Sequence, residues 1–176
     1  MNFIPESEIN IKDVPYFEEI NTGNGWQGHS TTKSIDKLKA EIISAVERLG
    51  GIIVGFQKGK FQINDKDREG YQLNYTVNMP NNKIFYGRID VAALPIKNEY
   101  KLRKSYESRK NKALKMALYM LKISLDGLWF LQQLSPGYSA LMPWMLVEDN
   151  KTISQIWGEK TILKNLLSSV NNNKEK

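Results

Sequence analysis

Residues 71–92, YQLNYTVNMPNNKIFYGRIDVA, decide the fold class of this chain. From Tyr71 to Val77, apolar and polar side chains alternate, which predicts a strand with one face in the core and the other in water. Pro80-Asn81-Asn82 has the composition of a turn, and a second strand is predicted over 84–92. Because the connection is short, the two strands must pair antiparallel.

A helix is predicted upstream of this hairpin, over residues 34–49. Apolar residues recur there at helical spacing, at Ile35, Leu38, Ile42, Ala45, Val46 and Leu49. Thr32 or Ser34 can cap the start of the helix, and Gly50 can take the left-handed conformation that ends it.

Between this helix and residue 71, the sequence predicts a short buried strand over 52–56. Lys58-Gly59-Lys60 reads as a turn, after which Phe61 and Ile63 form a short partner strand. The sheet would therefore have three or four antiparallel strands.

A long helix is predicted over 99–133, with a basic first half and an apolar second half that Gly127 can bend. After it, Thr152 can cap a short helix whose Ile153, Ile156 and Trp157 face inward, and 161–170 is predicted as one more helix. The fold class is α+β: helix, antiparallel sheet, long helix, then short C-terminal helices. We expect an N-terminal arm over 1–32, partly flexible, a single domain over 33–170 and a disordered tail over 171–176.

The composition excludes several kinds of site. The 176 residues contain no cysteine and one histidine, His29, which excludes disulfides, thiolate chemistry and any site in one chain built on two histidines. No cofactor is predicted. The acidic N-terminus does not resemble a signal peptide, and no stretch is apolar enough to predict a membrane span. The cytoplasm of a host cell is the expected location.

The net charge of +6 is concentrated in residues 97–115, KNEYKLRKSYESRKNKALK. Two glutamates accompany eight cations in this segment: Lys97, Lys101, Arg103, Lys104, Arg109, Lys110, Lys112 and Lys115. A basic helical face of this kind favours a polyanionic partner, and either DNA or RNA would fit. Tyr100 and Tyr106 lie among the cations and could stack on bases. The alternative is that these cations form only a solvated face.

Three acids of residues 65–69 are weak candidates for a metal site: Asp65, Asp67 and Glu69. Acids at alternate positions before Gly70 match the first half of a calcium-binding loop, but the residue at the twelfth position is Thr76 instead of Glu. A solvated hairpin turn is the competing interpretation. A metal-dependent nuclease acting through Asp65, Asp67 and Asp90 is a further alternative, although the Glu-x-Lys motif of such enzymes is absent from the predicted strands.

Residues 23–28, GNGWQG, match the spacing G-x-G-x-x-G. In dinucleotide-binding units this motif follows a strand, opens a helix and belongs to a parallel βαβ unit. Here it follows an acidic segment and the sheet is predicted to be antiparallel, so a loop is the favoured interpretation.

The sequence resembles a group of small phage-encoded proteins over about residues 31–160. The similar stretches include Thr31-Thr32-Lys33-Ser34, Lys39-Ala40-Glu41-Ile42 and residues 113–125. The resemblance implies a phage origin and a fold pattern but no activity. The order of elements also resembles Rad52-like single-strand annealing proteins. Residues 108–113, SRKNKA, are similar to the second-helix pattern of double-stranded-RNA-binding domains.

These observations favour a non-enzymatic nucleic-acid-binding protein of phage or mobile-element origin, with recombination or strand annealing as its expected role. The alternatives are an interaction module that binds an acidic host or phage protein, and the nuclease. Replacing Lys104, Arg109, Lys110 and Lys112 with Glu is expected to abolish nucleic-acid binding without unfolding the protein.

Overall fold

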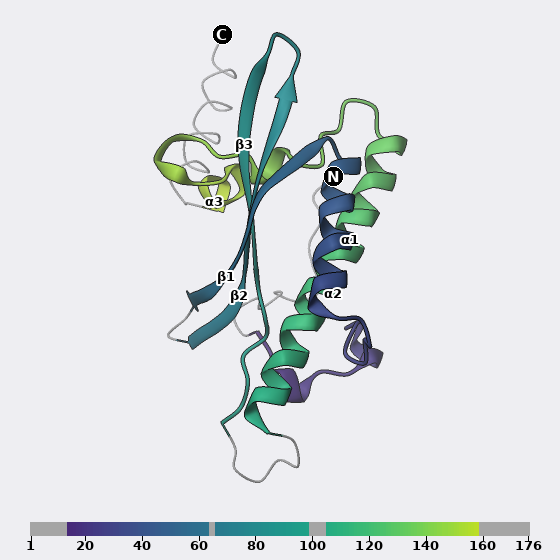
Figure 1. Ribbon diagram of the computed structural model, residues 1–176, viewed down its shortest axis with the longest axis vertical. Helices are drawn as coiled ribbons and strands as arrows, with labels where there is room; N and C mark the ends of the chain where they lie inside the picture. Colours follow the sequence, from purple (N-terminus) through teal and green to yellow (C-terminus); the bar gives the residue numbers. More distant parts are fainter. Residues whose placement is uncertain (1–13, 64–65, 99–104, 159–176) are drawn as a thin grey trace, which may run out of the picture.

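The computed structural model describes residues 14–63, 66–98 and 105–158, and its architecture is the predicted α+β fold (Figure 1). The described elements, in chain order, are η1 (Phe17–Glu19), η2 (Thr22–Asn24), α1 (Ile35–Arg48), β1 (Gly51–Ile63), β2 (Lys66–Met79), β3 (Lys83–Ala92), α2 (Tyr106–Leu134), η3 (Met142–Trp144), η4 (Glu148–Asn150) and α3 (Ile153–Gly158).

The three strands form an antiparallel sheet in the order β1-β2-β3. α1 and α2 lie on one side of this sheet, and the segment that contains α3 lies on the other (Figure 1). Arg88 of β3 fixes that segment, because its guanidinium donates to the Asn150 carbonyl and to the Gln155 side chain. The helix-covered face therefore holds the core, and the opposite face is only partly covered.

The core lies between the sheet and the two helices. The alternation of β2 sends Leu73 and Tyr75 toward the helices, where both are fully buried. Leu38 of α1 and Leu118 of α2 are buried against them. Burial of each such side chain stabilises the fold by roughly 1.5–3 kcal/mol. The Tyr75 hydroxyl donates to the Leu141 carbonyl at 2.9 Å, so the one polar atom of this ring is satisfied.

β1 corrects the prediction for residues 58–60, which do not form a turn. β1 runs without interruption to Ile63, and β2 begins at Lys66 instead of Tyr71. The lysines of the predicted turn face an acid across the ladder: Lys60 lies opposite Glu69, and the Lys58 ammonium is 3.2 Å from the Glu69 carboxylate. Cross-strand pairs of this kind stabilise a sheet, and the composition of one strand does not reveal them.

The helix ends agree closely with the sequence patterns. The Ser34 hydroxyl caps α1 by accepting from the Lys37 amide, and Gly50 has φ +93° directly after the helix. Thr152 caps α3 in the same way, by accepting from the Gln155 amide. Trp157 differs from its prediction, because 57% of its surface is exposed.

α2 begins later than predicted. Ser105 caps it and Tyr106 is its first residue, whereas residues 99–104 of the predicted helix lie outside the described residues. The helix continues through Gly127 to Leu134 without interruption. The predicted helix over 161–170 and the predicted tail also lie outside the described residues.

The described part of the N-terminal arm is joined to the core. Phe17 and Ile20 are both buried, and the Phe17 amide donates to the Pro95 carbonyl at 2.9 Å. This contact places residues 14–33 beside the start of α2, which decides the charge of that region.

Candidate polyanion-binding face

The structure divides the predicted basic segment into three parts. Tyr100, Lys101, Arg103 and Lys104 lie outside the described residues. Lys97 precedes α2 in an irregular stretch, and α2 itself carries Tyr106, Arg109, Lys110, Lys112 and Lys115.

Arg109 was expected to be an exposed cation, but the structure shows that it is buried. Only 6% of the residue is exposed, and its guanidinium forms an ion pair with Glu18 and donates to the Lys97 carbonyl. Glu18 lies 91 positions earlier in the sequence, so local charge counting could not reveal the pair. Replacing Arg109 with Glu would place a second carboxylate beside Glu18, so this change is expected to disturb the fold, contrary to the prediction from sequence.

Lys97 and Lys110 are also matched by acids. The Lys97 ammonium is 2.5 Å from Glu19, and the Lys110 ammonium is 3.0 Å from Glu69 and 3.3 Å from Glu107. The hydrogen bonds that Lys110 donates to Glu69 and, with a smaller effect, to Glu107 raise the pKa of its ammonium group. Much of the described charge at the start of α2 is therefore balanced within the protein.

Glu69 joins two of the cations, Lys58 and Lys110. Burial would raise the pKa of its carboxyl, but the hydrogen bonds from Lys110 and Lys58 outweigh burial and hold that pKa below its ordinary value. Glu69 thus stays ionised and serves as a structural counter-charge between β1 and α2.

Lys112 and Lys115 have different surroundings, because they line a polar hollow between the N-terminal segment and α2. The hollow has a volume of about 370 Å³. It offers hydroxyls, an amide and two ammonium groups, and its lining residues are Gly28, His29, Ser30, Thr31, Thr32, Ser108, Asn111, Lys112 and Lys115. We call this the loop–helix hollow.

Gly28 brings the loop close to α2. Its φ is +80°, and a Cβ atom at this position would lie 2.5 Å from the Tyr119 ring. A side chain would therefore hold the loop away from the helix. The exposed His29 stacks its ring on buried Phe17, with the ring centroids 4.9 Å apart, and this contact further orients the loop. The G-x-G-x-x-G sequence is thus part of a loop that packs on α2.

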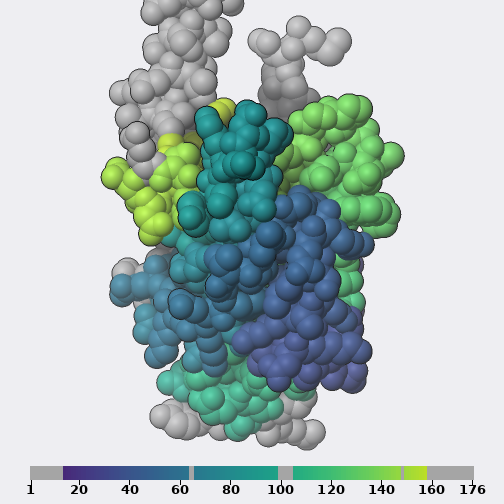
Figure 2. Space-filling view, turned by 45° about the horizontal axis from the view of Figure 1, so that its top comes forward, coloured from purple at the N-terminus to yellow at the C-terminus, as the bar shows by residue number. Residues whose placement is uncertain are grey.

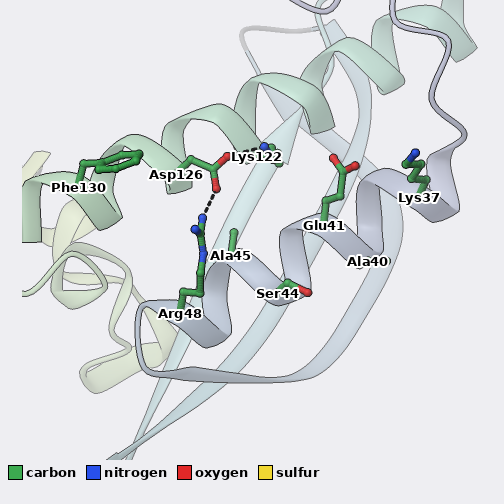
Figure 3. A pocket seen from close by; sticks show the side chains of 9 residues that line it. All are labelled: Lys37, Ala40, Glu41, Ser44, Ala45, Arg48, Lys122, Asp126 and Phe130. Carbon is green, nitrogen blue, oxygen red and sulfur yellow. Dashed lines mark hydrogen bonds and ion pairs between the residues drawn. The ribbon is translucent and has the colours of Figure 1, made fainter.

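Beyond Tyr119, the same flank of α2 borders a second hollow, the groove between α1 and α2 (Figure 3). It has a volume of about 620 Å³ and is lined by Lys37, Ala40, Glu41, Ser44, Ala45, Arg48, Lys122, Asp126 and Phe130. Figure 3 shows Arg48 and Lys122 both directed at Asp126, with which they form ion pairs. The bond to Asp126 raises the pKa of Lys122.

Lys33 lies between the two hollows. Its ammonium is 2.7 Å from Glu41 and 5.9 Å from the centre of the Tyr119 ring. Figure 2 shows the purple N-terminal segment next to blue α1 and the start of α2. The two hollows therefore form one face, with Lys33 at their junction.

We call this surface the α1–α2 basic face. It carries six cations and two acids: Lys33, Lys37, Arg48, Lys112, Lys115 and Lys122, with Glu41 and Asp126. Within the described part of the chain, neither Lys37 nor Lys115 forms an ion pair. Sequence reasoning identified Lys112 and Lys115 but missed the cations contributed by α1. The spacing of Lys37 and Arg48 places both on one stripe of α1 and was the available signal, whereas Lys33 precedes the helix.

The candidate metal ligands are not brought together. Asp65 lies outside the described residues. Asp67 is exposed on β2, whereas Asp90 of β3 lies opposite Gln72, whose side-chain amide donates to the Asp90 carboxylate. Residues 67 and 72 are an odd number of positions apart, so Asp67 and Asp90 point to opposite faces of the sheet and cannot share one metal ion. Among the described residues, no three His, Asp or Glu side chains are grouped closely enough to hold a metal.

Within residues 14–63, 66–98 and 105–158, no helix combines the length and apolarity that a membrane span requires. No protein-family model, curated protein or solved structure matches this chain.

Proposed function

We propose that this protein binds nucleic acid through the α1–α2 basic face, without catalysing a reaction. The observation that carries the proposal is the excess of six cations over two acids on one continuous surface. Lys37 and Lys115, which form no ion pair within the described residues, can contact phosphates without first breaking an internal ion pair. Neutralising phosphates in this way releases counterions and drives binding of either DNA or RNA.

The dimensions of the face suit a phosphate backbone. Lys112 and Lys122 are ten residues apart on α2, which corresponds to about 15 Å along the helix. A duplex strand presents one phosphate about every 3.4 Å of its axis, so several phosphates fall within this span. The hydroxyls and the amide of the loop–helix hollow can donate to further phosphate oxygens.

These contacts favour backbone binding over base reading. Tyr106 is the one predicted stacking residue among those described, and its ring centre lies 5.8 Å from the Arg109 guanidinium and 5.9 Å from the Lys110 ammonium. It therefore packs on the balanced side of α2 and is not one of the residues that line the loop–helix hollow. We expect the binding to depend little on the base sequence of the nucleic acid. A phage origin, which rests on the resemblance in sequence, and a role in recombination or strand annealing, which rests on the order of elements, belong to the same proposal.

The test is a mobility-shift panel over single- and double-stranded DNA and RNA at two salt concentrations. We expect binding at low salt that weakens steeply as salt rises. Lys112→Glu with Lys115→Glu should weaken it by about 100-fold or more. Lys66→Glu with Lys83→Glu, which makes the same charge change at exposed sites elsewhere, is the matched control and should have a small effect. Equal effects of the two pairs, or no binding by the wild-type protein, would refute the proposal.

An acidic protein is the second candidate partner, favoured by the interhelical groove. Ala40 and Ser44 on α1 leave room for a partner's backbone, and Phe130, 59% exposed, lies at the end of the groove. An acidic helix could occupy such a site. Capture of a partner from a lysate treated with nuclease would favour this function if purified nucleic acids fail to bind.

A further inference from the structure

The loop–helix hollow differs from the interhelical groove in its balance of charge. The groove contains Glu41 and Asp126 beside its cations, whereas none of the described residues that line the loop–helix hollow is an acid. Lys112 and Lys115 place two cations in its lining. A ligand in this hollow therefore meets positive charge with no carboxylate beside it, which favours an anion with more than one negative charge.

The hollow also contains hydrogen-bonding groups that the protein does not use. Within the described part of the chain, no hydrogen bond or ion pair involves the side chains of four residues that line it: Ser30, Thr32, Ser108 and Asn111. The Thr31 hydroxyl accepts from the Lys33 amide at 3.3 Å, and its own hydrogen can still be donated. Four hydroxyls and an amide thus lie around the two cations, and all of them can donate to the oxygens of one anion.

The contact between Gly28 and Tyr119 closes one end of the hollow. Gly28 lines the hollow, and a Cβ atom on it would lie 2.5 Å from the Tyr119 ring, so the loop backbone and this ring pack directly on each other. The Lys33 ammonium, 5.9 Å from the centre of the ring, is paired with Glu41. A continuous backbone must both enter and leave a hollow, whereas the end of a strand enters only once. The closed end therefore favours the end of a strand.

We propose that the loop–helix hollow binds the terminal phosphomonoester of a nucleic-acid strand, an inference that rests on the nucleic-acid binding proposed above. A phosphomonoester carries about −1.5 to −2 charges at pH 7 and has three oxygens that accept hydrogen bonds strongly. An internal phosphodiester carries a single negative charge. The monoester therefore matches the two ammonium groups of Lys112 and Lys115 and can accept from more of the unused donors.

The rest of the strand lies on the α1–α2 basic face. Lys115 and Lys122 are seven residues apart on α2, which corresponds to about 10 Å along the helix. The phosphates that follow the bound end therefore reach Lys122, and Lys37 lines the same groove. The volume of the hollow, about 370 Å³, falls within the range of about 300–1,000 Å³ that is typical of small-ligand pockets. It can thus admit the sugar of the last nucleotide together with its phosphate.

The dissociation constants of oligonucleotides that differ only at their ends test this assignment. One sequence is prepared with a 5′-phosphate, with a 3′-phosphate, with hydroxyls at both ends, and with a methyl ester on the terminal phosphate. One of the two phosphorylated forms should bind about tenfold or more tightly than the hydroxyl form, because it gains charge-assisted hydrogen bonds. The methyl ester, which lowers the charge of the terminal phosphate to that of a diester, should lose most of this gain. Equal binding of all four forms would overturn the inference and leave the proposed function intact, whereas binding of none would overturn both.

Two double variants test whether the preference arises in the hollow. Ser108→Ala with Asn111→Ala removes two donors without changing the charge, and alanine suits a helix, so the preference should fall to about twofold or less. Ser154→Ala with Asn78→Ala removes the same side chains at exposed positions elsewhere and should leave the preference at about tenfold. An unchanged preference in both variants would overturn the assignment to this hollow. A nucleoside monophosphate that binds as tightly as the phosphorylated oligonucleotide would identify a free nucleotide as the ligand and would overturn the assignment to a strand end.

Discussion

Arg109 and Lys110 lie on one flank of α2, and Lys112 and Lys115 lie on the other, yet the two pairs have opposite surroundings. Glu18, Glu69 and Glu107 surround the first pair, whereas the second faces hydroxyls and an amide. The first pair thus holds the fold together, and the second belongs to a surface with excess positive charge. The number of cations in a stretch of sequence therefore does not give the net charge of the surface that it forms, because the fold places acids from distant segments beside some of those cations.

Arg109→Met should have the largest effect on the stability of the protein. It removes the ion-pair partner of Glu18 and leaves this largely buried carboxylate with the hydrogen bond from the Lys97 amide, so we expect a loss of about 3–5 kcal/mol in the free energy of unfolding. Urea denaturation measures it. The double variant with Glu18→Gln should recover part of the loss, and a stability equal to wild type in the single variant would contradict the structural role of Arg109.

Gly28→Ala should destabilise the loop that lines the loop–helix hollow beside Lys112 and Lys115. The left-handed backbone and the clash with Tyr119 should together cost about 2–4 kcal/mol, and the loop–helix hollow should change shape. Gly25→Ala is the matched control, because Gly25 has φ +83° but no atom within 4 Å of the place that a Cβ atom would take. It should cost about 1 kcal/mol, from backbone strain alone. Thermal unfolding of both variants checks the difference; equal losses would mean that Tyr119 yields to the added methyl.

The smallest expected effect concerns the pH dependence of stability. The pKa of Glu69 is below its ordinary value, so ionised Glu69 stabilises the fold above pH 4.5, and this contribution is lost as the pH falls through the folded-state pKa. Lys110→Gln should make that acid-induced loss of stability smaller than in the wild type. Denaturation at pH 7 and pH 3.5 measures it. A steeper acid loss in Lys110→Gln than in the wild type would contradict the assigned role.

The sequence was sufficient for the parts of the fold that depend on local patterns. The alternation over residues 71–77, the turn at Pro80 and the Ser34 cap all act within a few residues, and each prediction is confirmed. β1 was mispredicted because the composition of Lys58-Gly59-Lys60 is typical of a turn. In the folded protein, pairing with β2 brings Glu69 beside these lysines, and the sequence near residues 58–60 does not indicate that contact.

The candidate site was less predictable for the same reason. The cluster of cations over 97–115 was visible, but the burial of Arg109 depends on Glu18, and the α1–α2 basic face depends on two helices packing side by side. Lys37 and Arg48 gave a weak signal on α1 alone. Only their position beside Lys122 makes them part of one surface.

The salt dependence of nucleic-acid binding tests the central distinction between the two flanks most directly. Lys37→Gln with Lys115→Gln and Lys58→Gln with Lys110→Gln remove the same charge from the basic face and from the balanced region. The first pair should reduce the slope of log Kd against log salt by about 1.4–1.8, since each phosphate contact contributes about 0.7–0.9. The second pair should leave the slope unchanged. A reduction by the second pair and none by the first would contradict the account.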